Sequence, residues 1–418
     1  MGKTYVANKM SFMQNIGQTV QSAPHSIKFK CRVLVALGWN NPRTIRAIGQ
    51  YARTAGWHLE TGLFYDGTIP RHWHGDGLIV SHPRRVDLLA FIRQQAPRQP
   101  TVLIGRNEPG VIVGQGQVMG DNIMAGRLVA KHFIERGHTH FAWITAYSGH
   151  VSNDRYEGFN SALAELGFKC HRLEYRPNRS TSDDGRHRQA WLARHLRALP
   201  HPLACYVLDD QLASEAIEVC LANGWRVPED FAVMGTGNIE ISCECSHVPI
   251  SSVDLAEEEI ALKAAMLLDG MMRGQKPPAE PIVIAPRGIV IRSSTDFLAV
   301  ENPLLRRAVD FIGANLRRPI SLDHVAETVG VSRRTLYSLF RRHLSRSPAK
   351  FVTQVRLDHA RQLLVAEPNQ TLDNLAAQVG LASRRVLSQI FLRHSGINAR
   401  EWKKRSQRLA VLPNEPIK

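Results

Sequence analysis

The sequence of 418 residues lacks the short motifs that mark many enzymes. It contains no G-x-x-x-x-G-K-[ST] phosphate loop, no G-x-S-x-G nucleophile turn and no H-E-x-x-H metal helix. Long apolar runs are missing too, since none approaches the ~20 residues that span a bilayer. Residues 1–29 have no apolar segment typical of a secretion signal and are interpreted as a flexible leader. We therefore expect a non-enzymatic protein that uses no cofactor and stays in the cytoplasm.

Cysteine is scarce, and its spacing does not predict a metal site. The six cysteines are Cys31, Cys170, Cys205, Cys220, Cys243 and Cys245. Cys243-x-Cys245 can bind a metal, but reduced thiols are the favoured interpretation because zinc-finger spacing is missing. The segment HWHGDG at residues 72–77 also lacks the usual ligand spacing and is interpreted as a loop.

Acidic residues are outnumbered, and the imbalance is concentrated near the C-terminus. The formal net charge is +16. Residues 301–418 hold 21 lysines and arginines but only 9 aspartates and glutamates, so this segment supplies +12 of that charge. Such a concentration is typical of a surface that binds phosphates. Nucleic acid is therefore the expected partner of this part of the chain.

The same basic segment contains one pattern written twice, between residues 321 and 405. Leu322, Val325, Ala326, Val329 and Gly330 recur fifty positions later as Leu372, Leu375, Ala376, Val379 and Gly380. Each copy predicts an amphipathic helix, a turn at the glycine, and a second helix. This layout is the helix-turn-helix of DNA-binding proteins, made twice. Two helical hairpins that contact another protein are the alternative, which the positive charge disfavours.

The residues expected to contact DNA lie on the second helix of each copy. They are Ser332, Arg333, Arg334, Thr335, Arg341 and Arg342 in the first copy, and Ser383, Arg384, Arg385 and Arg393 in the second. The first turn of such a helix reaches base edges while arginines meet phosphates. A helix predicted at 348–364, about 25 Å long, can hold the two copies about one DNA turn apart, roughly 34 Å.

Between residue 31 and about 296, short apolar runs alternate with helical stretches. The predicted strands are 33–37, 77–80, 102–104, 141–144, 203–208 and 231–234, and the predicted helices include 44–54, 125–136, 155–166, 189–199, 211–223 and 257–272. This alternation predicts parallel sheets covered by helices on both faces. Its length suggests an α/β fold of two lobes with a cleft between them.

Polar residues that follow these strands are the candidate ligand contacts, because ligands bind beyond the carboxyl ends of parallel strands. They are Trp39, Asn41, Asp121, Arg155, Asp210 and Asn238. Carboxylates accept hydrogen bonds from hydroxyls, a guanidinium donates as a fork, and an indole offers an apolar face, so the set suits a sugar. Each also has a structural alternative: Asp121 and Asp210 can cap helices, and Trp39 can be core.

Residues 303–405 resemble the DNA-binding domain of AraC-type regulators. LDHVAETVGVSRRTLYSLFRRHL, RLDHARQLLV and LDNLAAQVGLASRRVLSQIFLRHSGINAREW carry the resemblance. The second copy departs from the family at Gly380-Leu381, Val386-Leu387 and Asn398-Ala399, where the family has Gly-Phe, an aromatic pair and Thr-Pro. Apolar volume is kept, which preserves the fold and leaves base contact by the second helix open.

The middle region is similar to the effector domain of LacI-type repressors and to periplasmic sugar-binding proteins. DNIMAGRLVAKHFIERGHTHFAWI and DRYEGFNSALAELG carry this resemblance, with LDDQLASEAIEVCLANGWRVPEDFAVMGTGN. It implies that Asp121, Arg155 and Asp210 contact a sugar. Gly237 stands where that family has aspartate, followed by a matching Asn238.

A LacI-like sensor followed by an AraC-like reader is similar to the bacterial xylose-operon activators, over residues 31–408. The resemblance implies a homodimer that binds promoter DNA, activates genes of xylose uptake and catabolism, and is controlled by D-xylose in the cleft. The expected domains are the leader 1–29, the sensor 30–298, the reader 299–410 and a tail 411–418. Another sugar, repression, a sugar transport protein and a sugar-modifying enzyme are the alternatives.

Overall fold

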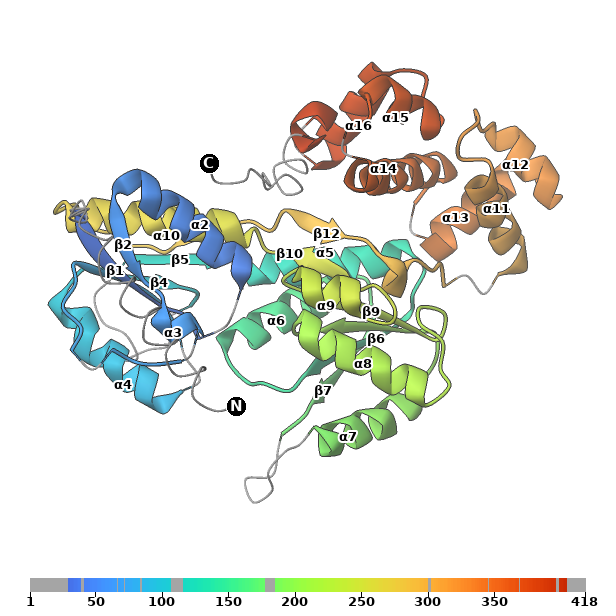
Figure 1. Cartoon of the computed structure of the whole chain (residues 1–418). Helices are drawn as coiled ribbons and strands as arrows, with labels where there is room; N and C mark the ends of the chain where they lie inside the picture. The colour runs from blue at the N-terminus through green and yellow to red at the C-terminus, as the bar shows by residue number, and fades with distance from the viewer. Residues whose placement is uncertain are drawn as a thin grey trace, which may run out of the picture.

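In the computed structural model, two α/β lobes are followed by a separate group of helices (Figure 1). The structure describes residues 29–403 except 39–40, 66, 71, 83–84, 107–115, 177–184, 300–301, 345, 368 and 396–397. Trp39, the predicted leader up to residue 28 and the predicted tail lie outside the described residues. No helix in the described ranges is long and apolar enough to cross a membrane.

The first lobe is built on a six-stranded parallel sheet in the order β11-β5-β4-β3-β1-β2. Its strands are β1 (Cys31–Ala36), β2 (Trp57–Glu60), β3 (Gly77–Ser81), β4 (Thr101–Ile104), β5 (Gly116–Gly120) and β11 (Ile282–Ile284). The helices are α2 (Pro42–Ala55), α3 (Gly62–Tyr65), α4 (Val86–Gln95) and α10 (Glu257–Met272). Val33 and Val35 pack in the cluster with α2 and α10, whereas Leu34 and Ala36 pack with α4, as the twofold alternation of a strand requires.

The second lobe has a sheet in the order β12-β10-β9-β8-β6-β7, parallel except that β12 runs antiparallel to β10. Its strands are β6 (His140–Thr145), β7 (Cys170–Glu174), β8 (Leu203–Val207), β9 (Phe231–Thr236), β10 (Ser251–Asp254) and β12 (Gly288–Val290). Its helices are α5 (Asn122–Glu135), α6 (His150–Ala164), α7 (Arg186–Arg197), α8 (Asp210–Ala222) and α9 (Glu240–Cys245). Fully buried Trp143, Tyr206, Phe133, Phe141 and Phe159 fill its core.

The chain passes between the lobes three times. It crosses from β5 to α5, from β10 to α10, and from β11 to β12. The last crossing continues through a short 3₁₀ turn, η2 (Ser293–Thr295), directly into the helical region. The carboxyl ends of the strands therefore lie beside the segments on which the lobes can hinge.

The helical region contains the two predicted helix-turn-helix units. They are formed by α11 (Pro303–Ala314), α12 (Leu322–Val329), α13 (Arg333–Leu344), α14 (Pro348–Ala366), α15 (Leu372–Gln378) and α16 (Arg384–Ser395). Gly330 and Gly380 have φ of 75° and 70°, the left-handed conformation expected at the turns. Helix α14 packs Phe351 into one core and Leu357 into the other, so it joins the units as predicted. The predicted fold class is confirmed.

Candidate functional site

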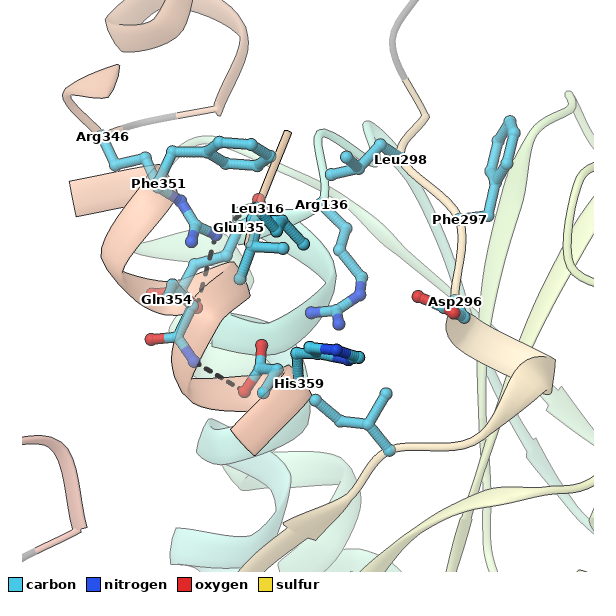
Figure 2. Close-up of a pocket in the computed structure, with 13 residues that line it drawn as sticks. Glu135, Arg136, Asp296, Phe297, Leu298, Leu316, Arg346, Phe351, Gln354 and His359 are labelled. Carbon is cyan, nitrogen blue, oxygen red and sulfur yellow. Dashed lines mark hydrogen bonds and ion pairs between the residues drawn. The ribbon is translucent and has the colours of Figure 1, made fainter. Parts of the chain in front are cut away.

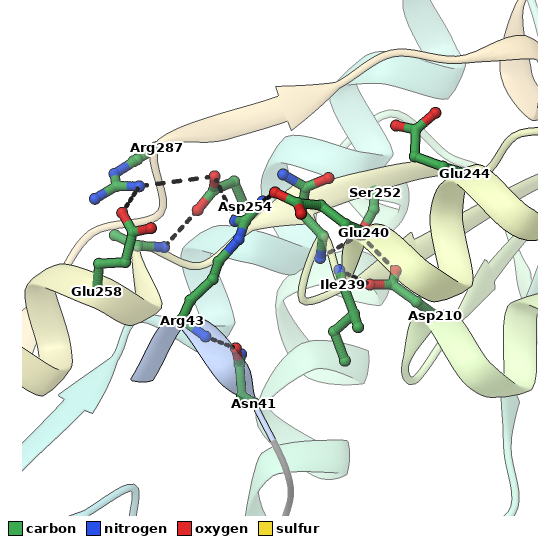
Figure 3. A network of polar contacts seen from close by, with 12 residues as sticks. Asn41, Arg43, Asp210, Ile239, Glu240, Glu244, Ser252, Asp254, Glu258 and Arg287 are labelled. Carbon is green, nitrogen blue, oxygen red and sulfur yellow. Dashed lines mark hydrogen bonds and ion pairs between the residues drawn. The ribbon is translucent and has the colours of Figure 1, made fainter. Parts of the chain in front are cut away.

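Asp210 is the centre of the polar site in the second lobe. It follows β8, has no exposed surface, and accepts hydrogen bonds from the Ile239 backbone N–H at 2.7 Å and from Ser252 Oγ at 2.5 Å (Figure 3). Burial raises the pKa of its carboxyl. The alternative that Asp210 caps α8 is wrong, because Asp209 accepts the hydrogen bond from Leu212 N that caps this helix.

Two glycines at the end of β9 allow Asp210 to approach this strand. A Cβ on Gly235 would lie 2.3 Å from Asp210 Oδ1, far inside contact distance. Gly237 has φ of 120°, and a Cβ there would lie 3.3 Å from Asp210 Oδ2. An aspartate at 237 would bring a second carboxylate close to Asp210.

Arg155 connects α6 to the first crossing and to the end of β8. It is buried, its Nε donates to Asn122 Oδ1 at 2.9 Å, and its Nη1 donates to the Leu208 carbonyl. Gly126 and Gly158 bring α5 and α6 close enough for this contact. A Cβ on Gly126 would lie 2.2 Å from the Arg155 carbonyl oxygen, and one on Gly158 would lie 2.0 Å from a carbonyl oxygen of α5.

The remaining predicted ligand residues are more strongly engaged in local structure. Asp121 caps α5 by accepting from Met124 N at 2.8 Å, and Asn41 caps α2 by accepting from Arg43 N at 3.0 Å. Asn238 has φ of 51° and donates through its backbone to Ser252 Oγ at 2.9 Å. The structure therefore joins Asn238 to Asp210 through a shared serine.

Ion pairs between the lobes were missed by the sequence analysis. Arg106, which follows β4 of the first lobe, donates to both carboxylate oxygens of Asp154 in α6, at 2.7 and 2.8 Å. Arg43 of α2 lies 3.5 Å from Asp254 and 3.4 Å from Glu240 in the second lobe (Figure 3). The rule that selected residues after strands applies equally to Arg106, and it was not extended to that loop.

A further acidic residue lies where α10 begins. Glu257 accepts a hydrogen bond from Thr44 Oγ1 at 3.4 Å across the two segments that enter the first lobe. Burial raises the pKa of its carboxyl, and nearby Arg155 opposes this shift. Apart from its place on a predicted helix, no pattern in the sequence marks Glu257 as a site residue. Among the described residues, no group of three or more His, Cys, Asp or Glu could hold a metal ion.

All ten residues predicted to contact DNA have exposed side chains. They lie at the start of α13 and α16 or on the outer faces of these helices. Ser332 Oγ accepts from Thr335 N at 3.1 Å and so caps α13. Arg334, Tyr337, Ser338, Arg341 and Arg342 lie together on one face of this helix. Exposed guanidinium groups on such a face form a surface suited to the phosphates of DNA.

Two segments match known protein families. Residues 130–295 match the periplasmic binding protein-like domain, and residues 325–405 match a helix-turn-helix domain. The first match precedes the second along the chain, as the second lobe precedes the helical region. They therefore support separate sensing and DNA-binding parts.

Two curated relatives and one solved structure each align with two thirds or more of this chain. The xylose operon regulatory protein of Escherichia coli strain K12 is 24% identical over 286 residues, 68% of this chain and 72% of that protein. The protein of the same name from Haemophilus influenzae is 25% identical over 338 residues, 77% of this chain and 84% of that protein. A solved structure of the xylose-binding transcription activator XylR covers 90% of this chain and 99% of its own, with 21% identity and a TM-score of 0.56. That likeness shows the shared fold.

Proposed function

We propose that D-xylose is the effector of this chain, a transcription regulator that joins a periplasmic-binding-protein-like sugar sensor to an AraC-type DNA reader and is not an enzyme. The regulator activates genes for the uptake and catabolism of this sugar. The names of its relatives support the choice of sugar, and the buried carboxylate site supports the class of ligand.

The hydrogen-bonding capacity left at Asp210 carries the proposal. A carboxylate offers about four lone-pair sites, and the described contacts from Ile239, Ser252 and the Cys243 thiol use three of them. The remaining site can accept from a hydroxyl of a pentose. Arg155 uses its Nε and Nη1 within the protein, and its remaining N–H groups can donate to sugar oxygens. A neutral polyhydroxylated ligand therefore matches the site better than an anion, which Asp210 would repel.

The lobes provide a way to convert binding into a change of shape. Sugar that contacts both lobes binds more tightly when they are closed and shifts the population toward that state. The pairs Arg106–Asp154 and Arg43–Asp254 join the lobes in this structure, and we assign them to the closed arrangement. Closure moves the last crossing, and the reader attached to it moves as well. In a homodimer, this movement positions both readers on promoter DNA.

Titration calorimetry tests the ligand. Purified protein is titrated with D-xylose, L-arabinose, D-ribose and D-glucose, and the same titrations are run on Asp210→Ala. The matched control is Asp209→Ala, which removes the adjacent α8 cap but leaves the buried carboxylate. Selective D-xylose binding that persists in Asp209→Ala and is lost in Asp210→Ala is expected.

Other outcomes separate the alternatives. Selective heat with another sugar contradicts D-xylose and favours a changed specificity, for which the missing carboxylate at Gly237 gives a reason. Failure of every sugar to bind contradicts the sugar-sensing proposal. An equal loss of sugar binding in Asp210→Ala and Asp209→Ala shows that the carboxylate of Asp210 is not the specific contact.

A further inference from the structure

A buried chain of hydrogen bonds leads from Asp210 to the contact between the sensor and the reader. We propose that Thr295, at the centre of this chain, is a positioning residue that couples the ligand cleft to the first recognition helix. The inference rests on the proposed function insofar as Asp210 contacts the ligand. Thr295 itself lies outside the cleft and is fully buried.

The cleft end of the chain begins at Ser252. This serine donates to Asp210 Oδ1 and accepts from the Asn238 backbone N–H. The side chain of Asn238 accepts from Arg292 Nη2 at 3.0 Å. The backbone of Arg292 encloses Ser251 Oγ, which accepts from Arg292 N at 2.8 Å and donates to Arg292 O at 2.9 Å. A shift of the carboxylate therefore acts on the segment after β12.

The reader end of the chain runs through a histidine whose tautomer is defined by its neighbours. Thr295 Oγ1 donates to Ser251 Oγ at 2.7 Å, and His132 Nε2 lies 3.0 Å from Thr295 Oγ1. Arg136 Nη1 lies 3.2 Å from His132 Nδ1. Because arginine only donates, Nδ1 accepts and the proton of neutral His132 is on Nε2. From Arg136 through His132 and Thr295 to Ser251, each group therefore donates its hydrogen bond to the next.

Burial makes this chain sensitive to displacement. Ser251 and Thr295 have no exposed surface and His132 is 6% exposed, so solvent does not replace a lost partner. The pKa of His132 is held well below its usual value by burial and then by Arg136, which keeps the ring neutral. Arg136 Nε also donates to the Thr295 carbonyl at 3.1 Å. Thr295 and Arg136 are therefore joined through both backbone and side chain.

The turn after Arg136 touches the recognition helix directly. Ala299 N donates to the Arg136 carbonyl at 2.9 Å. A Cβ on Gly137 would lie 3.1 Å from Leu344 Cδ2 and 3.3 Å from the His343 carbonyl oxygen, both at the end of α13. Because of this close contact, a movement of the turn at Gly137 should also move the end of α13.

Space for a second arrangement is present at the same junction. A cavity of about 270 Å³ lies between α5, the segment 296–298 and α14, and its lining includes Arg136, Asp296, Gln354 and Asp358 (Figure 2). Arg346 closes one side by donating to the Glu135 carbonyl and pairing with its carboxylate at 3.4 Å. This half-open space beside Arg136 leaves room for its side chain to reorient.

The series of hydrogen bonds also includes η2, a segment that must move when the lobes hinge. Thr295 ends η2, which follows the third crossing between the lobes and precedes the reader. Rotation of the lobes changes the direction of this crossing. The hydrogen bonds that join Thr295 to Ser251 and His132 determine whether Arg136 moves together with this crossing.

The test compares Thr295→Val, which keeps the shape and removes the hydroxyl, with Thr295→Ser, which keeps the hydroxyl. Hydrogen exchange of the amides in residues 343–351 is measured in the full-length protein. The cleft is perturbed in two independent ways, by saturating D-xylose and by Asp210→Asn. Calorimetry on the same samples measures binding of D-xylose separately.

In the wild type and in Thr295→Ser, each perturbation should change exchange in 343–351 by about fivefold or more, the low end of coupling between sites. In Thr295→Val the change should fall below about twofold on the same scale, while D-xylose affinity is retained. An undiminished response in folded Thr295→Val overturns the inference, as does no response of the wild type to either perturbation.

Two failures are kept distinct. If calorimetry detects no D-xylose binding, the proposed effector is wrong, and the Asp210→Asn arm still decides the role of Thr295. If Thr295→Val does not fold, His132→Phe takes its place, because it removes the hydrogen bonds that His132 forms with Thr295 and Arg136. A wild-type response in folded His132→Phe then overturns the inference.

Discussion

The guanidinium of Arg333 donates to both carboxylate oxygens of Asp323, at 3.1 and 3.0 Å. The second unit repeats the relationship, with Arg384 Nη1 3.6 Å from Asp373 Oδ2. All four side chains are exposed, and exposed ion pairs contribute little to folding. We infer that each aspartate holds an arginine in place at the start of a helix that is predicted to contact DNA.

Replacing Arg333 with alanine should therefore weaken DNA binding without unfolding the reader. We expect about tenfold lower affinity for a duplex selected from a random pool by the full-length protein. Fluorescence anisotropy at several salt concentrations measures it. Arg127→Ala, which removes an exposed pair with Glu165 in the sensor, is the matched control. Unchanged affinity in Arg333→Ala would remove this side chain from the recognition surface.

Breaking one pair between the lobes should weaken sugar binding at a distance from the ligand. Arg106→Ala removes the bidentate contact with Asp154, whose side chain is only 10% exposed, and so disfavours the closed state. A loss of about three- to tenfold in sugar affinity is expected, because affinity falls with the population of the competent state. Calorimetry measures the affinity and small-angle X-ray scattering the closure. Wild-type affinity would show that the pair does not stabilise closure.

The close crossing of α5 and α6 predicts a strong effect for a single methyl group. Gly158→Ala should destabilise the protein by about 3 kcal/mol, because its Cβ meets backbone that cannot move easily. It should also weaken sugar binding by separating Arg155 from Asn122. Gly49→Ala in α2 is the control, since a Cβ there meets nothing within 4 Å and alanine favours helix. Thermal unfolding that ranks the two variants equally contradicts this account.

His138 predicts a loss of stability in acid. Within the described part of the chain neither ring nitrogen has a hydrogen-bond partner, and burial lowers its pKa to about 3, with Arg136 acting in the same direction. The unfolded state takes up a proton below about pH 6.5 while the folded state does not. This contribution to stability is therefore present above pH 6.5 and lost as the pH falls toward 3. The loss is about 1.4 kcal/mol per pH unit within that window.

The measurement is denaturant unfolding between pH 4 and pH 8. His138→Phe should flatten the acid side of the profile, with His132 still contributing in the same direction, because the pKa of that ring is also lowered. His171→Gln, at an exposed position, should leave the profile unchanged. An acid slope equal to that of the wild type in His138→Phe would contradict the assignment.

The reader could be predicted closely from the sequence because its signals are local. Helical spacing predicted that Val325 and Val329 share an apolar face, and both lie in the core, while Gly330 marked the turn. The sensor was harder to predict because its short edge strands carry weak signals. Strands β7 and β11, for example, were missed, since β7 is mostly polar and β11 has only three residues.

The candidate ligand site could be predicted only in part because its geometry depends on long-range contacts. Asp210 lies beyond a strand as predicted, but nothing in the local sequence indicates its contact with Ser252, 42 residues away. Asp121 and Asn41 carry the same kind of signal and are found as helix caps. A polar residue that follows a strand can therefore be located from the sequence, but its hydrogen-bond partner cannot be predicted.

Helix α14 contributes side chains to both cores of the reader, which makes the distance between the recognition helices a property of one continuous rod. A protein with a flexible tether tolerates changes in the number of base pairs between two half-sites. This chain should not, because one added base pair turns the second half-site by about 34–36° around the duplex, as ten to 10.5 pairs make a full turn. Its promoters should therefore keep a fixed phase between half-sites even where their base sequence drifts.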